Sequence, residues 1–202
     1  MQLKVFERKN NKLVIPVPER LADCIELIKS DQFRKKGERV SLSSIIKQMV
    51  FHPFASTLIW FRLSNYGKSK LRYYPFRLMY RISSVYHNIN IPISTMIGYG
   101  LYIGHGNSIV INDKCVIGNN VNISHFVTIG SNYNTPPTIL DNVYIGPNAC
   151  IIEDVIIGQN SIIGAGTVVT KDIEANCTAI GVPGRILNRK NHNFIQNPWI
   201  IK

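Results

Sequence analysis

The sequence predicts a mainly β protein in which a parallel β-helix follows an α-helical N-terminal region. The main observation is an aliphatic residue at every sixth position through most of the second half: Ile97, Ile103, Ile109, Ile117, Ile123, Ile129, Ile145, Ile151, Ile157, Ile163 and Val169. No α-helix explains a period of six, whereas a strand with a corner every six residues does. Three such hexads close one coil, and stacked coils pair through parallel hydrogen bonds.

The corners of these coils are marked by a second pattern. Three positions after most of the aliphatic residues comes Gly, Asn or Asp, as at Gly100, Asn120, Asn148 and Gly166. These residue types tolerate the left-handed backbone that a tight corner requires. Phe126 is the exception. The six-residue repeat and its corner residues together predict the same coil.

Two breaks in the repeat predict local insertions. Ile103 and Ile117 are 14 residues apart, two more than two hexads, and we expect a small bulge near 111–114. Ile129 and Ile145 are 16 residues apart, and the four extra residues predict a loop within 131–138. Loops on a rigid scaffold often carry specificity.

The N-terminal region has helical spacing instead. Pro18 opens a pattern with spacings of three and four that Gly37 ends, and Ser41 is placed to cap a second helix. We expect helices within 18–37, 42–51, 54–65 and 76–86. The predicted division is a basic helical region over 1–90, a β-helix over 91–187 and a tail over 188–202. The tail's Trp199 would dock on a neighbour or belong to a frayed end.

Composition excludes several classes of protein. With 202 residues, 45% hydrophobic, the chain buries a sizeable core, and no apolar run is long enough to cross a membrane. Neither a signal peptide nor tight cysteine spacing is visible, so we expect four reduced thiols in a cytoplasmic protein.

The net charge of +11 lies entirely in residues 1–90, where 17 Lys and Arg face 6 Asp and Glu. Residues 91–202 hold 6 of each. A basic, aromatic-containing segment can touch RNA, anionic lipid or a phosphorylated substrate, or can be a solvated helical surface.

Counting along the repeat places four side chains in one outward-facing column. His105, His125, Pro147 and Ala165 each follow an inward aliphatic residue by two positions, on consecutive coils. Neighbouring coils are about 4.8 Å apart, so the column extends roughly 14–15 Å. Its upper end is titratable and its lower end is small and smooth. This arrangement suits a long, thin ligand whose reactive end meets the histidines.

Five segments of this region resemble the hexapeptide-repeat acyltransferases. Their order along the chain is similar to that in the serine acetyltransferases and the related bacterial sugar O-acetyltransferases. The resemblance covers about residues 90–187. Its segments are GLYIGHGNSIVIN (100–112), IGNNVNISHFVTIG (117–130), VYIGPNACI (143–151), SIIGAGTVVTKDI (161–173) and AIGVPGRI (179–186).

The resemblance implies a left-handed β-helix, a homotrimer and acetyl-CoA bound between subunits, with no metal. It implies that His105 is the general base for direct acetyl transfer to a hydroxyl, and we group His125 with it as catalytic. Expected cofactor-binding residues are Gly146, Pro147, Gly164, Ala165, Lys171 and Arg185. The cysteines need not be nucleophiles.

Departures from the family pattern point away from serine as acceptor. Gly104 stands where serine acetyltransferases carry Asp, Asn90 where they carry a second acid, and Thr135-Pro136 where they carry Arg-His. We therefore expect a neutral hydroxyl, a sugar of a surface-polysaccharide pathway, with Asn90 and Tyr133 in acceptor binding. The basic helices would then bring the enzyme to anionic lipid at the inner membrane face, with no nucleic acid partner.

Three alternatives remain open at the level of sequence. The first is a serine O-acetyltransferase of cysteine biosynthesis with rearranged acceptor contacts. The second is a non-catalytic β-helix scaffold whose basic helices bind lipid or nucleic acid. The third is a zinc enzyme, which is disfavoured because the repeats offer only His105 and His125 where three histidines are needed.

Overall fold

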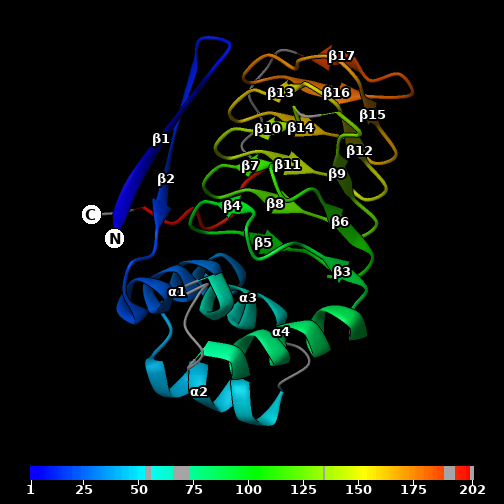
Figure 1. The fold of residues 1–202 in the computed structure, drawn as a ribbon. Helices are drawn as coiled ribbons and strands as arrows, with labels where there is room; N and C mark the ends of the chain where they lie inside the picture. The colour runs from blue at the N-terminus through cyan, green and yellow to red at the C-terminus, as the bar shows by residue number, and fades with distance from the viewer. Residues whose placement is uncertain (53–55, 66–72, 134, 189–193, 201–202) are drawn as a thin grey trace.

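The structure is a computed structural model that describes residues 1–52, 56–65, 73–133, 135–188 and 194–200. A β-hairpin and four helices precede a stack of triangular coils (Figure 1). The N-terminal elements are β1 (Gln2–Arg8), β2 (Asn11–Val17), α1 (Leu21–Lys36), α2 (Leu42–Phe51), α3 (Thr57–Asn65) and α4 (Tyr74–Tyr86).

The coils form three parallel sheets, one for each side of the triangle. The first sheet, in spatial order, is β4 (Met96–Ile97), β7 (Val116–Ile117), β10 (Thr138–Ile139) and β13 (Ile156–Ile157). The second is β5 (Tyr102–Ile103), β8 (Asn122–Ile123), β11 (Tyr144–Ile145), β14 (Ile162–Ile163) and β16 (Thr178–Ile180), with β17 (Arg185–Asn188) added antiparallel. The third is β3 (Ile89–Asn90), β6 (Ile109–Ile111), β9 (Thr128–Gly130), β12 (Cys150–Ile152) and β15 (Val168–Val169).

The aliphatic repeat forms the core, as predicted. Ile117, Ile129, Ile145, Ile157 and Ile163 have no exposed surface. Burial of these inward-facing aliphatic side chains is the main favourable contribution to the stability of the stack. The corner pattern is confirmed at Gly100, Asn120, Asn148, Asn160 and Gly166, whose φ lies between 54° and 66°. After Ile151 the positive φ belongs to Glu153 rather than to Asp154. Phe126 adopts the same left-handed conformation, with a φ of 58°.

The four predicted helices are present. Gly37 ends α1 in the left-handed conformation, and the Ser41 hydroxyl accepts a hydrogen bond from the Ser44 amide at the start of α2. The predicted start of the third helix at Phe54 lies outside the described residues, and α3 is described from Thr57. The fourth begins at Tyr74, with Pro75 in its first turn.

The expectation that residues 1–90 are helical is wrong for the first seventeen. They form an antiparallel hairpin that lies along the β-helix (Figure 1). Lys9 and Asn10 at its tip both have positive φ, which matches the right-handed twist of a two-residue hairpin turn. Leu13 and Ile15 are buried against Leu140 and Ile156 of the coils. The alternation Leu13, Ile15, Val17 was the available signal.

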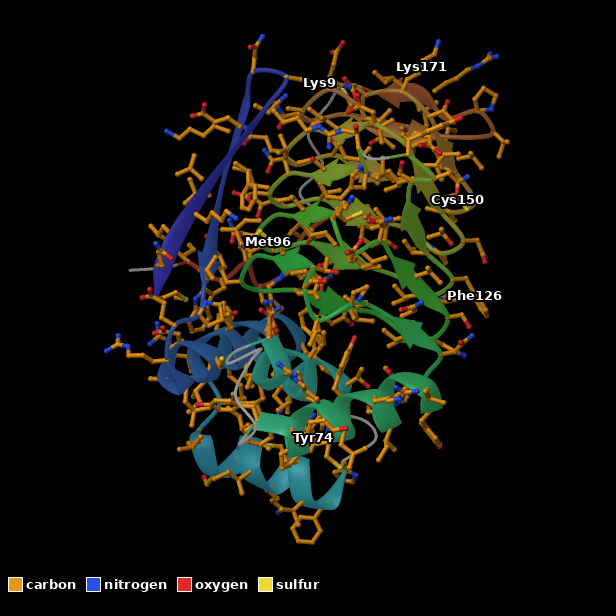
Figure 2. All side chains as sticks on the ribbon, in the orientation of Figure 1. Lys9, Tyr74, Met96, Phe126, Cys150 and Lys171 are labelled. Atoms are coloured by element: carbon orange, nitrogen blue, oxygen red, sulfur yellow. The ribbon has the colours of Figure 1, made fainter. Side chains whose placement is uncertain are left out.

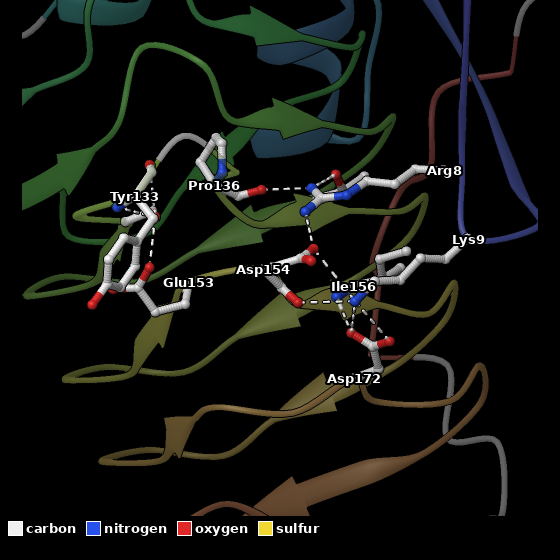
Figure 3. A network of polar contacts seen from close by, with 10 residues as sticks. Arg8, Lys9, Tyr133, Pro136, Glu153, Asp154, Ile156 and Asp172 are labelled. Atoms are coloured by element: carbon white, nitrogen blue, oxygen red, sulfur yellow. Dashed lines mark hydrogen bonds and ion pairs between the residues drawn. The ribbon is translucent and has the colours of Figure 1, made fainter.

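Salt bridges and hydrogen bonds attach the hairpin tip to one corner of the stack. Arg8 hydrogen-bonds to Asp154 and to the Pro136 carbonyl, and Lys9 lies 3.3 Å from the Asp172 carboxylate (Figure 3). The Arg8 guanidinium beside Asp154 lowers the pKa of that carboxyl. These pairs are exposed, so they orient the hairpin more than they stabilise it.

A buried ion pair joins the helices to the first coil. Arg62 of α3 donates from Nε to Asp31 of α1 at 2.8 Å, and both side chains are almost fully buried. Arg62 also donates to the Ile97 and Gly98 carbonyls, and Asp31 accepts from the Leu101 amide at 2.8 Å. The pair therefore satisfies backbone groups that the first coil leaves open.

The described part of the tail, residues 194–200, docks on its own chain rather than ending free. The Trp199 ring lies edge-on to Phe33, with centroids 5.4 Å apart. Its backbone amide donates to Asn120 Oδ1 at 2.9 Å, and Asn120 Nδ2 donates to its carbonyl. In the described residues, no helix is long and apolar enough to cross a membrane.

Removing one partner of the buried pair should unfold the protein more easily. We expect Arg62→Met to lower the free energy of unfolding by about 3–5 kcal/mol, because it leaves the Asp31 carboxylate buried without a counter-charge. Denaturant titration measures the loss. Lys29→Met, which removes an exposed pair with Glu26, should cost less than about 1 kcal/mol. Equal losses would contradict this role for the pair.

Candidate active site

The corner that carries His105 contains the two-residue insertion, and the predicted position of that insertion is wrong. Ile103 pairs with Ile123, but Ile111, not Ile109, pairs with Ile129. Eight residues therefore separate the paired strands in the first coil, where six separate them in the next. The extra residues lie between Ile103 and Ile109, not at 111–114.

The insertion pushes His105 out of the regular corner. Ser108 takes the left-handed position that Phe126 occupies one coil later, and the Asn107 carbonyl accepts a hydrogen bond from the Phe126 amide at 3.0 Å. His105 adopts an additional left-handed conformation of its own, with a φ of 51°. Its side chain is exposed. The spacing of two residues from Ile103 therefore predicts the correct edge of the β-helix for His105. The side chain, however, protrudes from that edge.

The remainder of the column is arranged as predicted. The Asn148 amide donates to the His125 carbonyl at 3.1 Å, and the Gly166 amide donates to the Pro147 carbonyl at 2.8 Å. His125, Pro147 and Ala165 therefore occupy the same corner of consecutive coils. The rings of His105 and His125 meet edge-on, with centroids 5.9 Å apart. The two histidines form one pair at the end of the smooth edge that lies nearest the helices.

A cavity of about 430 Å³ adjoins this pair. It lies between the helical region and the first coil. The helices contribute Asp31, Gln32, Lys35, Gln48, Ser56, Thr57, Leu58 and Ile59, and the region around the first coil contributes His87, Ile89, Leu101, Tyr102, Ile103, His105 and Gly106. His105 therefore lines a space large enough for a small molecule, which is where a general base must act.

The charged groups that line the cavity differ in how free they are. Burial raises the pKa of Asp31, and Arg62 opposes this shift by pairing with it. Both Asp31 oxygens already accept hydrogen bonds from Arg62 or Leu101. Lys35, by contrast, is exposed. The cavity therefore offers an ammonium group more readily than a carboxylate.

His125 carries an unusual feature for a partly buried histidine. Its Nδ1 atom is buried and has no hydrogen-bond partner among the described residues. A buried polar atom without a partner costs stability and calls for a functional reason. Its place beside His105 makes it a candidate for contact with a bound ligand.

The cofactor-binding candidates divide into two groups by position. An added Cβ at Gly146 would meet the Ala165 amide at 2.8 Å, and one at Gly164 would meet the Ile180 side chain at 2.7 Å, so both glycines are required by close packing. Arg185 is exposed and follows Gly184, whose amide donates to Val168 near the lower end of the column. These residues share the histidine-bearing edge.

Three candidates do not join that edge within one chain. Lys171 follows β15, at the corner where the hairpin tip docks, at the far end of the molecule from the helices (Figure 2). Tyr133 is 79% exposed in the loop between β9 and β10, beside Glu153 (Figure 3). Asn90 is exposed on β3 and does not line the cavity.

The predicted loop is present, and polar contacts hold part of it against the coil. The Ser131 hydroxyl donates to Glu153 at 2.7 Å, and Arg8 binds the Pro136 carbonyl (Figure 3). Asn134 lies outside the described residues. Within one chain this loop occupies a different corner from His105.

Sequence reasoning missed the helical side of the cavity. Lys35 is exposed and Gln32 buried on α1, Gln48 is partly buried on α2, and Tyr102 is a partly buried strand residue. Their spacing carries no motif, because what brings them to His105 is the docking of the helices by the Arg62–Asp31 pair. Among the described residues, no three His, Cys, Asp or Glu side chains gather as metal ligands.

The cysteines are placed as wall or core residues. Burial raises the pKa of Cys24 and of Cys115 to about 12, so neither is a thiolate near neutral pH. Cys150 is partly exposed on β12 and Cys177 is buried.

We expect Cys150 to react first with iodoacetamide in the native protein, because it alone among the four is partly exposed. Cys24 and Cys115 should resist until the protein unfolds. Peptide mass spectrometry over time measures the order. Early labelling of Cys24 or Cys115 would contradict the burial that the structure shows.

Comparisons with known proteins agree with this geometry. The bacterial transferase hexapeptide family (six repeats) matches residues 136–171. The serine acetyltransferase of Bacillus pumilus (strain SAFR-032) is 31% identical over 153 residues, covering 69% of this chain and 70% of that protein. The crystal structure of serine acetyltransferase from Brucella abortus strain S19 has a TM-score of 0.70 at 26% identity and covers 84% of this chain and 71% of that one. A serine acetyltransferase in complex with CoA has a TM-score of 0.68 at 25% identity, covering 83% and 71%.

The stacked hexads and the histidine-bearing edge define a hexapeptide-repeat acyltransferase with a left-handed parallel β-helix. The alignment with the Bacillus pumilus enzyme, at 31% identity over about 70% of each chain, identifies the family within this class. The chain belongs to the serine acetyltransferase family.

Proposed function

We propose that the protein transfers an acetyl group from acetyl-CoA to a hydroxyl group, with His105 as the general base. The observation that carries this proposal is the placement of His105, which protrudes between a cavity of about 430 Å³ and a smooth edge built of glycine, proline and alanine. The edge suits a thin donor and the cavity suits an acceptor. His105 lies where the two would meet.

The donor site follows the edge from His125 to Arg185. The structural relative in complex with CoA supports CoA as the ligand. The pantetheine arm would pass Pro147 and Ala165, and the Arg185 guanidinium would approach the CoA phosphates. This edge is open on one side, so we propose a homotrimer in which a second copy closes it and brings Tyr133 and Lys171 near the ligand.

The reaction is a direct transfer. His105 accepts the proton of the acceptor hydroxyl as that oxygen attacks the thioester carbon, and the tetrahedral intermediate carries its charge on the former carbonyl oxygen. The C–S bond then breaks, the thiolate takes the proton back from His105, and the ester and CoA leave. His125, whose Nδ1 has no hydrogen-bond partner in the described part of the chain, would bind this reacting centre. No cysteine needs to carry the acetyl group.

L-Serine is the acceptor that the relatives favour, and we propose it ahead of a sugar. The absence of the family's charged groups at Gly104 and Thr135-Pro136 argued against serine. Lys35 can take the place of the family's basic group, because its ammonium lines the cavity and can pair with the carboxylate of serine. The product would be O-acetyl-L-serine, in the pathway to cysteine.

A sugar hydroxyl is the second candidate, and two observations favour it. The cavity is much larger than a serine molecule, and the carboxylate that it contains, Asp31, is already neutralised by Arg62. No free acid among the lining residues then awaits an acceptor ammonium. A polyhydroxyl acceptor requires neither charge, and Gln32, Gln48 and Thr57 supply polar groups on the helical side.

Release of CoA from acetyl-CoA with and without L-serine distinguishes these acceptors. Serine-dependent release with a raised KM for serine in Lys35→Met, but not in Lys36→Met, would support serine held by Lys35. Lys36 is the matched control because it is the exposed next residue of α1. CoA release that ignores serine but responds to sugars would support the second candidate.

Replacing the proposed base should abolish turnover without preventing donor binding. We expect His105→Ala to lower kcat by about 10²–10⁴-fold, with the affinity for CoA changed less than twofold in calorimetry. His52→Ala, at an exposed histidine after α2, is the control and should retain full activity. An active His105→Ala enzyme would refute the proposed base.

A bulky residue on the smooth edge should block the donor. We expect Ala165→Phe to raise the KM for acetyl-CoA at least tenfold, because a phenyl ring would fill the path of the pantetheine arm. Ala175→Phe introduces the same ring at another exposed corner and should leave the KM unchanged. Equal effects, or none, would show that the donor follows a different route.

A further inference from the structure

The end of the molecule formed by α2 and α4 exposes an apolar surface with basic edges. We call it the basal surface; it lies at the opposite end of the fold from β17 (Figure 1). Its apolar members are Leu42, Ile46, Val50 and Phe51 on α2 and Tyr74, Leu78, Ile82, Val85 and Tyr86 on α4. Exposed Lys47 and Arg81 lie among them.

The spacing of these residues shows that each helix is amphipathic. Leu42, Ile46 and Val50 recur every fourth residue along α2, while Ile45 on the other side is buried in the core. Along α4, Leu78 and Ile82 continue the stripe that Tyr74 begins, and Tyr80 on the opposite side is buried. Residues three or four apart share a helix face, so both helices bury one apolar face and expose another.

The exposed fractions are large for apolar side chains. Val50 is 65% exposed, Phe51 67% and Val85 74%. Single exposed apolar residues are normal, but stripes on two helices at the same end of the molecule mark an interaction site (Figure 1). The stripes extend beyond the proposed transfer site, to which α2 contributes only Gln48.

The charge of this region specifies the partner. From residue 39 to residue 112 the sequence contains no Asp or Glu, while it contains eight basic residues: Arg39, Lys47, Arg62, Lys68, Lys70, Arg72, Arg77 and Arg81. Of these, Arg62 is committed to the buried pair with Asp31, Arg39 lies over the Trp199 ring, Arg77 is partly buried, and Lys68, Lys70 and Arg72 lie outside the described residues. Lys47 and Arg81 remain as exposed cations on α2 and α4. A surface that is apolar and solely basic is complementary to one that is apolar and anionic.

A second copy of the same surface is a poor partner by this criterion. A symmetric contact would bring Lys47 and Arg81 toward the same residues of the partner with no carboxylate from residues 39–112 to neutralise them. Like charges at an interface oppose association. A bilayer with anionic headgroups offers both an apolar and an anionic partner surface. Apolar side chains enter its interface, and basic side chains pair with its phosphates.

We propose that the basal surface binds the interface of an anionic lipid bilayer, with the apolar stripes of α2 and α4 inserted and Lys47 and Arg81 at the headgroups. The proposal does not depend on the identity of the acceptor. It places the cavity beside His105 near the membrane, because Gln48 of α2 lines that cavity.

Flotation of the full chain with vesicles tests this directly. At low salt, the protein should float with vesicles of phosphatidylcholine and 30% phosphatidylglycerol, remain unbound with pure phosphatidylcholine, and detach as salt rises. Each of Lys47→Gln and Arg81→Gln should weaken binding about fivefold. Lys12→Gln, at an exposed lysine of the hairpin, should change it less than twofold.

The apolar stripes are tested by Leu78→Ser combined with Ile82→Ser, with Leu187→Ser on exposed β17 as control. The double variant should lose vesicle binding and retain its oligomeric mass and thermal midpoint. No flotation of the wild-type protein at low salt would overturn the proposal. So would a decrease in mass in the double variant measured by light scattering, because a second copy would then cover the surface.

Discussion

Register between coils is the constraint on which the rest of this structure depends. Each coil satisfies its backbone hydrogen bonds on the coil before it and the coil after it, so every side of the triangle must return to the same phase. Inward aliphatic residues such as Ile117 and Ile145 fill the axis only when that phase holds. Extra residues can therefore be accommodated only at corners, and each insertion becomes a projection from a rigid support. His105 lies in one such projection, and the loop after β9 is the other.

The helical region completes what the first coil leaves unpaired. The Arg62–Asp31 pair satisfies backbone groups of Ile97, Gly98 and Leu101 and, in doing so, holds α1 and α3 against the coil. The cavity beside His105 exists because of this docking. Stability and the proposed chemistry are therefore coupled through one buried ion pair, which is expensive to bury and damaging to break. The hairpin attaches to a different corner and leaves the histidine-bearing edge open.

The sequence predicts the β-helix well because a period of six leaves few alternatives, and it predicts the edge of His125, Pro147 and Ala165 by counting. It misplaces the two-residue insertion, because a separation of 14 residues between Ile103 and Ile117, two more than two hexads, does not say which corner absorbs the extra residues. It misses the hairpin, whose alternation is short and whose partner residues, Leu140 and Ile156, are over a hundred positions away. It also misses Lys35 and Gln48, because their helices reach His105 through tertiary docking, which leaves no local pattern.

The insertion between Ile103 and Ile109 is what we propose places His105 for transfer. Deleting Gly106 and Asn107 restores a six-residue side and returns His105 to the regular corner. The decisive measurement is acetyl transfer by this deletion variant, alongside its circular dichroism and CoA affinity. We expect a folded protein that binds CoA but transfers acetyl groups no faster than His105→Ala. A folded deletion variant with wild-type transfer would contradict it, because the register of the corner would then have no part in placing the base.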